Sequence, residues 1–169
     1  MPVWDRFVRV FHWSLLALLL LALFSHGGLL DLHRLAGYGV IALVAMRVIW
    51  GFVGSRYARF ASFIPTPAGL ANYLGQMLRG REPRTIGHNP AGAVMILLLI
   101  AVISAVSITG LLLDTQTYRD YRPLHAWHDG LTDLLLVLTA IHVVGVIVTS
   151  LRHKENLVSA MITGRKRKP

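Results

Sequence analysis

Two histidines fourteen residues apart, His128 and His142, lie within the apolar stretch from Ala126 to Leu151. That stretch is long and apolar enough to cross a bilayer as a helix. At 100° per residue, the two side chains would be about 40° apart around the helix axis and about 21 Å apart along it. Ionisable side chains inside a membrane span are costly and usually mark a site. Because imidazole is a common metal ligand, the spacing predicts two metal-binding positions at two depths on one helix face.

The alternative is that both histidines are hydrogen-bonded residues that pack against neighbouring helices. For one histidine that explanation would be favoured, but two in register at this spacing favour ligands. The chain has no cysteine, which excludes disulfides, thiolate metal sites, iron–sulfur clusters and covalently attached c-type haem. A metal must therefore be held by His, Met or carboxylate groups, and two stacked, non-covalent haems would use two histidine positions of this kind.

The composition predicts an all-α integral membrane protein. Of 169 residues, 54% are hydrophobic, and they occur in long runs that a soluble domain of this size rarely contains. The length allows about four spans in one domain, residues 1–169. We expect an up-down bundle of four transmembrane helices with spans at about residues 7–29, 33–53, 90–113 and 126–151. An amphipathic pattern from Thr66 to Arg79 favours a short helix on the membrane surface over an irregular loop, and the tail after residue 151 is expected to begin as an interfacial helix.

Basic residues are distributed unevenly along the chain. Thirteen lie in the N-terminal segment, the 54–89 loop and the C-terminal tail, the last including Lys168, against three in the other two loops. The positive-inside rule then places both termini and the long loop in the cytoplasm of a bacterial inner (plasma) membrane. Because these charges flank apolar spans, the net charge of +9 indicates membrane topology and not nucleic-acid binding.

This topology sorts four histidines into two pairs by depth. His12 and His142 would lie on the cytoplasmic side, and His33 and His128 on the outer side. Two neutral imidazoles make a six-coordinate haem iron suited to electron transfer, with no open position for small-molecule chemistry. Gly37, Gly130 and Gly145 lie near three of these histidines and would let a flat macrocycle approach the helix backbone. We therefore predict two non-covalent haem b groups with these four histidines as iron ligands.

The remaining histidines fit less well. His125 could replace His128, but it would lie about 100° away from His142 around the helix; it could also contact a haem propionate. His26 and His153 fall at span ends and are expected to be interfacial. His88 precedes a helix cap and is expected to be structural, although a quinone site on that side could use it.

Arg47 is the other charge expected inside the membrane. It lies fourteen residues after His33 and hence on the same helix face. It could extend to the cytoplasmic headgroups, with Trp50 as an interfacial anchor, or it could form a salt bridge to a propionate of the inner haem.

The segments DRFVRVFHW, LHRLAGYGVIALVAMRVIWGFVGSRYARF, GHNPAGAVM, HDGLTDLLLVLTAIHVVGV and RHKENLVSAMITGRKR together resemble bacterial di-haem cytochrome b. The resemblance is to the prokaryotic cytochrome b561 type and the related cytochrome b subunit of Ni,Fe-hydrogenase, and it covers nearly the whole chain. It implies a four-helix bundle with two b haems held by the four histidines named above. It also implies electron transfer between membrane quinone and a redox partner, such as a periplasmic c-type cytochrome or a hydrogenase-like subunit.

Other functions remain open from sequence alone. A close variant of the electron carrier is a quinone oxidoreductase acting on a small species such as superoxide. A haem-free membrane anchor or assembly subunit would use the histidines for packing, and a small transporter would use them as proton relays. Transporters usually contain internal repeats and broken helices, and the sequence displays neither.

Overall fold

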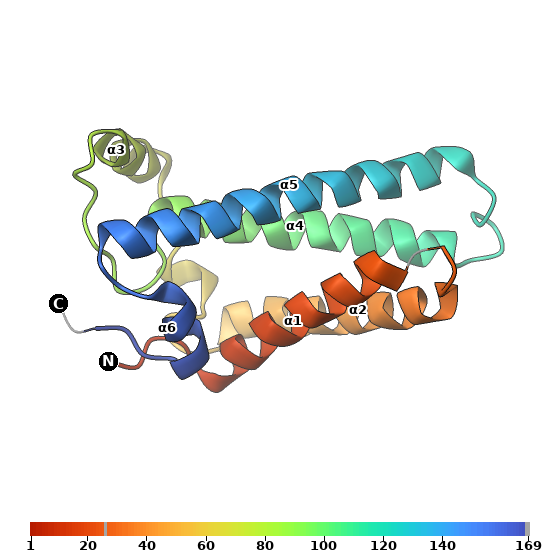
Figure 1. The fold of residues 1–169 in the computed structure, drawn as a ribbon, viewed down its shortest axis with the longest axis horizontal. Helices are drawn as coiled ribbons and strands as arrows, with labels where there is room; N and C mark the ends of the chain where they lie inside the picture. The colour runs from red at the N-terminus through yellow and green to blue at the C-terminus, as the bar shows by residue number, and fades with distance from the viewer. Residues whose placement is uncertain (26, 168–169) are drawn as a thin grey trace.

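The computed structural model describes residues 1–25 and 27–167, and within them the protein is all-helical (Figure 1). The described helices are α1 (Arg6–Ser25), α2 (Leu30–Val53), the short 3-10 helix η1 (Phe60–Ser62), α3 (Pro67–Leu78), α4 (Pro90–Leu113), α5 (Arg122–Arg152) and α6 (Leu157–Thr163). Helices α1, α2, α4 and α5 are long and apolar enough to cross a membrane. The expected all-α bundle with four spans and a short helix near residues 66–79 is therefore confirmed.

Local sequence explains where several helices begin. The side chains of Thr66, Asn89 and Asn156 each accept a hydrogen bond from a backbone N–H in the first turn of α3, α4 and α6. Such caps satisfy backbone donors that have no partner within the helix. Proline follows directly in α3 and α4, where its missing N–H removes no helical hydrogen bond.

Three helix boundaries differ from the sequence-based expectation. Helix α1 ends at Ser25 and not near residue 29, and Gly27 beyond it has a φ of +84°, which favours glycine. Helix α5 begins at Arg122, four residues earlier than expected, because Pro123 suits a first helical turn. The tail does not simply extend α5: a turn follows Arg152, and α6 is a separate helix.

The four long helices lie side by side (Figure 1). Helix α1 packs against α2, α2 against α4, and α4 against α5, whereas α1 and α5 are not closely packed in the described chain. Helices α2, α4 and α5 share an apolar core of buried side chains: Val40, Val44, Ile103 and Leu135. The arrangement leaves α1 and α5 apart within the described chain.

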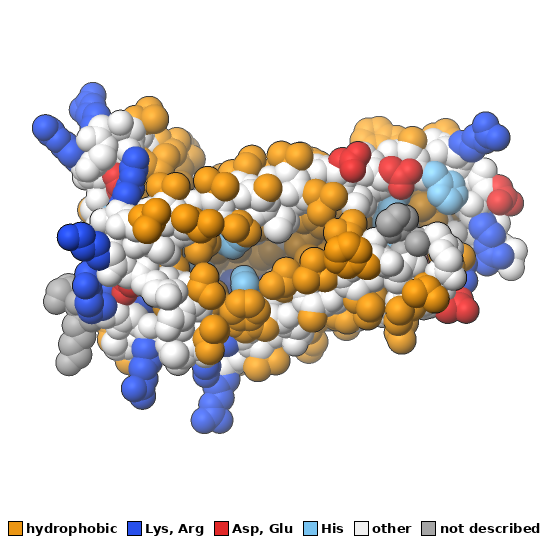
Figure 2. All heavy atoms as spheres, viewed as in Figure 1, with side chains coloured by type: hydrophobic (Ala, Val, Ile, Leu, Met, Phe, Trp, Pro, Cys, Tyr) orange, Lys and Arg blue, Asp and Glu red, His pale blue; other side chains and the backbone are white. Residues whose placement is uncertain are grey.

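Both termini, α3 and α6 lie at one end of the bundle, which we call the basic end (Figure 1). A second apolar cluster there includes Val3, Trp4, Val8, Ala58 and Ala160. Two ion pairs connect segments at the basic end. Arg84 Nη2 lies 2.8 Å from Glu155 Oε1, and Arg152 Nη1 lies 2.9 Å from Glu82 Oε1. Figure 2 shows most of the Lys and Arg side chains of this face at that end.

Candidate functional site

His33 and His128 meet near the end of the bundle opposite the basic end. His33 lies in the first turn of α2 and His128 in the second turn of α5. Their ring centroids are 6.3 Å apart and their planes are inclined by 73°. The two histidines are 95 residues apart in the chain, and α2 and α5 bring their imidazoles together.

The surroundings of each ring fix which nitrogen carries the proton. His33 Nδ1 lies 2.8 Å from the carbonyl oxygen of Ala22, and because a carbonyl only accepts, Nδ1–H donates. This carbonyl belongs to the last turn of α1, where carbonyls lack helical partners. In a neutral imidazole, Nε2 is then the unprotonated nitrogen, the form that binds a metal.

His128 is held in the same way from α4. Its Nδ1 lies 2.9 Å from the hydroxyl oxygen of Thr109, and that hydroxyl is 2.9 Å from the carbonyl oxygen of Val106, to which it donates. The hydroxyl therefore accepts from His128 Nδ1–H and leaves Nε2 free. The ring also passes close to Gly110, where an added Cβ would lie 3.1 Å from His128 Cε1.

This geometry fits two imidazoles that share one iron. Metal–imidazole bonds of about 2 Å on opposite sides of a metal separate the two ring centroids by roughly 6 Å. Hydrogen bonds from the outer ring nitrogen to a carbonyl or hydroxyl are the usual support of a ligating histidine. Within the described residues there is no group of three or more His, Cys, Asp or Glu side chains that could hold a metal ion, so these residues fit haem better than a metal cage.

His12 of α1 and His142 of α5 lie nearer the basic end than the His33–His128 pair. They are close enough to interact electrostatically, and His12 Nδ1 is buried with no hydrogen-bond partner. Figure 2 shows the molecule hollowed between the helices, with His side chains inside the hollow. A buried polar atom without a partner beside an open space fits a group that would enter the space and bind there.

Arg47 is only 4% exposed, so its guanidinium is buried within the protein. Its Nη2 donates to the carbonyl oxygen of Ala58 at 3.1 Å, and its guanidinium carbon lies 5.1 Å from the centre of the Phe60 ring. Nη1 is buried without a partner. Arg47 therefore holds the segment after α2 and still has one donor available for an anionic group.

Two glycines near the proposed ligands have open space beside them. A Cβ added at Gly37 or Gly145 would meet no atom within 4 Å. Gly37 follows His33 by four residues and Gly145 follows His142 by three, so each shares a face with its histidine. A Cβ added at Gly130 would also meet no atom within 4 Å, but two residues place Gly130 about 200° from His128, on the other side of α5.

The other histidines have separate surroundings. His125 is exposed and its Nε2 lies 2.8 Å from the carbonyl oxygen of Arg119. His153 caps the C-terminus of α5. His26 lies outside the described residues, as does Lys168 of the tail.

His88 is buried between the rings of Trp4 and Phe63, each with its centroid 4.6 Å away. Burial, together with the nearby charges of Arg47 and Lys166, lowers the pKa of His88 to about 3. The side chain is therefore a neutral ring in the apolar cluster of the basic end.

Sequence reasoning missed the residues that orient the His33–His128 pair. Ala22 acts through its backbone, so its side chain gives no signal. Thr109 is one of several hydroxyl residues in α4, and Gly110 is one of several small residues in that helix. A search for small or hydroxyl residues at the depth of each histidine on the neighbouring helix would have selected Thr109 and Gly110.

Comparison with known proteins places the chain in a family. Residues 3–164 match the family model described as prokaryotic cytochrome b561. A probable Ni/Fe-hydrogenase B-type cytochrome subunit of Rhizobium leguminosarum bv. viciae is 23% identical, with 97% of this chain and 87% of the relative covered. A protein of the same description from Bradyrhizobium diazoefficiens is 21% identical over 79% of this chain, which spans 64% of that relative. No solved structure matches the chain.

The family match covers nearly the whole chain and agrees with the four apolar helices. Haem b is the cofactor that this family implies, and a multi-pass membrane protein is what the helices form. The chain belongs to the prokaryotic cytochrome b561 family and is a membrane b-type cytochrome of electron transfer.

Proposed function

We propose that this cytochrome binds two haem b groups and carries electrons between membrane quinone and a redox partner. One haem would bind between His33 and His128, the other between His12 and His142. The observation that carries the proposal is the His33–His128 pair, with ring centroids 6.3 Å apart and both Nδ1 atoms already hydrogen-bonded. Histidines that only pack would not need both Nδ1 atoms hydrogen-bonded so that both Nε2 atoms stay available.

The protein's own residues account for the properties that such a site needs. The Ala22 carbonyl and the Thr109 hydroxyl accept hydrogen bonds from the Nδ1 atoms, which fixes the tautomer and the orientation of each ring. Haem, when bound, supplies a one-electron redox centre. With imidazoles on both sides of the iron no position is open to substrate, so the proposed role is outer-sphere electron transfer and not chemistry on a small molecule.

Arg47 is proposed to bind a propionate of the haem between His12 and His142. An uncompensated charge that is buried costs several kcal/mol, and pairing with a carboxylate offsets that cost. The buried Nη1 has no partner, and the only described acid that acts on Arg47 electrostatically is Asp5. A propionate would supply the missing hydrogen-bond acceptor and charge.

Helix α5 would connect the two centres, since it provides one histidine to each. Fourteen residues of helix separate His128 from His142 by about 21 Å along the axis. Two such centres would let electrons move between the two sides of a bacterial inner (plasma) membrane. The basic end, with both termini, is proposed to face the cytoplasm.

The redox partner is proposed from the relatives. Both are described as B-type cytochrome subunits of Ni/Fe-hydrogenase, so a hydrogenase-like subunit is one candidate. A periplasmic c-type cytochrome is the other, because the outer loop, residues 114–121, is short and leaves the His33–His128 end accessible to a small protein.

An absorption spectrum of the detergent-purified protein tests the proposal. Two low-spin b haems per chain are expected, and acid–acetone should extract all of the haem because no cysteine is present to attach it. A stoichiometry near one would mean that one histidine pair does not bind haem. Protein that folds and inserts without haem would favour the alternative function of an anchor or assembly subunit. Reduction of the haems by added quinol tests separately whether quinone is the substrate.

A further inference from the structure

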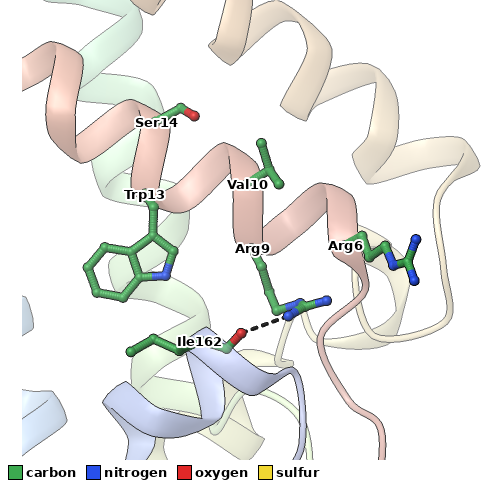
Figure 3. Close-up of a pocket in the computed structure, with 6 residues that line it drawn as sticks. All are labelled: Arg6, Arg9, Val10, Trp13, Ser14 and Ile162. Atoms are coloured by element: carbon green, nitrogen blue, oxygen red, sulfur yellow. Dashed lines mark hydrogen bonds between the residues drawn. The ribbon is translucent and has the colours of Figure 1, made fainter.

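A groove at the basic end lies apart from the histidines. It is lined by Arg6, Arg9, Val10, Trp13 and Ser14 of α1 and by Ile162 of α6, and its volume is about 660 Å³. Figure 3 shows Ile162 next to the indole of Trp13, with Arg9 between α1 and α6. Arg6, Val10 and Trp13 follow one another at intervals of four and three residues, so they share one face of α1.

The positive charge of this groove is not neutralised by the protein. In the described chain neither Arg6 nor Arg9 forms an ion pair with a carboxylate. The adjacent acid, Asp5, is directed elsewhere: its oxygens accept hydrogen bonds from Val8 N–H and from Trp50. Burial opposes the charge of Asp5, but these hydrogen bonds and one from Ser55 outweigh burial and lower its pKa. Asp5 therefore stays ionised and bound to the bundle.

Arg9 is held in position at the groove. Its Nη1 donates to the carbonyl oxygen of Ile162 at 2.7 Å (Figure 3). Its Nε is buried and has no hydrogen-bond partner. An arginine fixed by one hydrogen bond, with another donor unsatisfied, is preorganised to bind an anion that can accept several hydrogen bonds.

Below the arginines the groove becomes apolar and opens to the outside. Val10 is 65% exposed, Ile162 57% and Trp13 38%. Because α1 is a membrane-crossing helix, this wall continues into its lipid-facing surface. Arginine and tryptophan at the boundary of a span, with apolar surface beyond them, match the headgroup and acyl regions of a lipid in that order.

We propose that this groove is a binding site for an anionic phospholipid. The phosphate binds Arg6 and Arg9, and an acyl chain lies along Val10, Trp13 and Ile162. The apolar wall selects a lipid over a soluble phosphate, and the two arginines select an anionic headgroup over a zwitterionic one. Since Arg9 bonds to Ile162, bound lipid would also hold α6 against α1.

Native mass spectrometry of the detergent-solubilised holoprotein tests this site. Phosphatidylglycerol is titrated against phosphatidylcholine, and wild type should retain phosphatidylglycerol preferentially. Arg6→Gln/Arg9→Gln should bind it roughly tenfold more weakly, because two charge-assisted contacts are removed. Arg6→Gln alone should reduce binding in the same direction, and this variant removes no hydrogen bond that joins helices.

A matched variant separates a specific site from general attraction to negative membranes. Arg56→Gln/Arg59→Gln removes the same charge from exposed side chains at the same end of the bundle, outside the groove. It should leave the affinity for phosphatidylglycerol within about twofold of wild type. Equal losses in the two double variants, or equal binding of both lipids by wild type, would overturn the proposal. Displacement of the lipid by millimolar glycerol phosphate would likewise overturn it, in favour of a soluble anion.

Discussion

The Thr109 hydroxyl accepts a hydrogen bond from His128 and donates to the backbone of its own helix. Thr109→Val keeps the shape of the side chain but removes this support. Outer-ring hydrogen bonds of ligating histidines contribute roughly 10–100-fold to metal affinity. We therefore expect Thr109→Val to release one of the two proposed haems to the acceptor apomyoglobin about tenfold faster than wild type. The rate of release of the other haem should be unchanged. Thr132→Val is the control, because its hydroxyl bonds to the backbone oxygen of His128 and not to the ring. Equal haem loss in both variants would show that Thr109 acts only through helix packing.

Pairing of the ligands predicts how double variants behave. His33→Leu and His128→Leu should each lose, or convert to high spin, the same haem, and His12→Leu and His142→Leu the other. A double change within one pair should cost little more haem than either single change, because one missing ligand already opens that iron. A double change across pairs should abolish low-spin haem, as measured by optical and EPR spectra. His128→Leu with both spectra intact, combined with loss of one haem in His125→Leu, would refute the pairing.

His88 makes the protein sensitive to acid. Its pKa is about 3 in the folded state because of burial and neighbouring cations, against about 6.5 in an unfolded chain. Between these values the unfolded chain binds a proton that the folded chain does not, so the free energy of unfolding decreases as pH falls from about 6.5, by up to about 1.4 kcal/mol per pH unit. His88→Phe should remove this slope. Thermal unfolding in detergent at pH 7.5 and 4.5 measures it, with exposed His125→Phe as control; an unchanged slope in His88→Phe would contradict the prediction.

The nearness of His33 and His128 could be predicted from residue spacing, whereas their supporting contacts could not. Helix periodicity alone places His128 and His142 on one face, and depth matching then expects His33 beside His128, where the structure has it. The carbonyl of Ala22 becomes available only because α1 ends at Ser25. Apolar residues resume at Leu29, so hydropathy does not mark that boundary.

Helix α5 carries a histidine for each proposed haem, and a Cβ added at Gly37 or Gly145 would meet no protein atom within 4 Å. Leucine at these positions would occupy space beside the helix that haem is proposed to use. Gly37→Leu should therefore lower the haem of the His33–His128 pair, and Gly145→Leu that of the His12–His142 pair, with helix content by circular dichroism unchanged. Gly130→Leu, on the other side of α5, is the matched control. Full haem loading in all three variants would mean that the open space is not where haem binds.

Element boundaries were predictable where a cap residue marks them. Asn89 and Pro90 place the start of α4 at the expected residue. Helix α5 starts earlier than its apolar run because Pro123 initiates it within a polar segment. Hydropathy indicates where a helix is apolar, not where its backbone hydrogen bonds begin. For this reason the first turn of α5 was not predicted.

At the scale of the whole molecule, the order of packing determines where a cofactor fits. Contacts join α1 to α2, α2 to α4, and α4 to α5. The four proposed ligands belong to α1, α2 and α5, which border the space between α1 and α5. A four-helix bundle was predictable from the sequence. Which helix pair stays apart was not, since it depends on how Leu135, Ile103 and the valines of α2 pack together.

The distribution of basic residues predicts how the whole molecule is oriented in the membrane. Both termini, α3 and α6 share one end, and thirteen basic residues belong to the segments there, against three at the other end. Because translocating Lys and Arg is disfavoured, the basic end should remain in the cytoplasm. Green fluorescent protein fused at the C-terminus should fluoresce, whereas alkaline phosphatase inserted near residue 118 should be active. Active phosphatase at the C-terminus would reverse the orientation, and the His12–His142 pair would then lie on the outer side with its pairing unchanged.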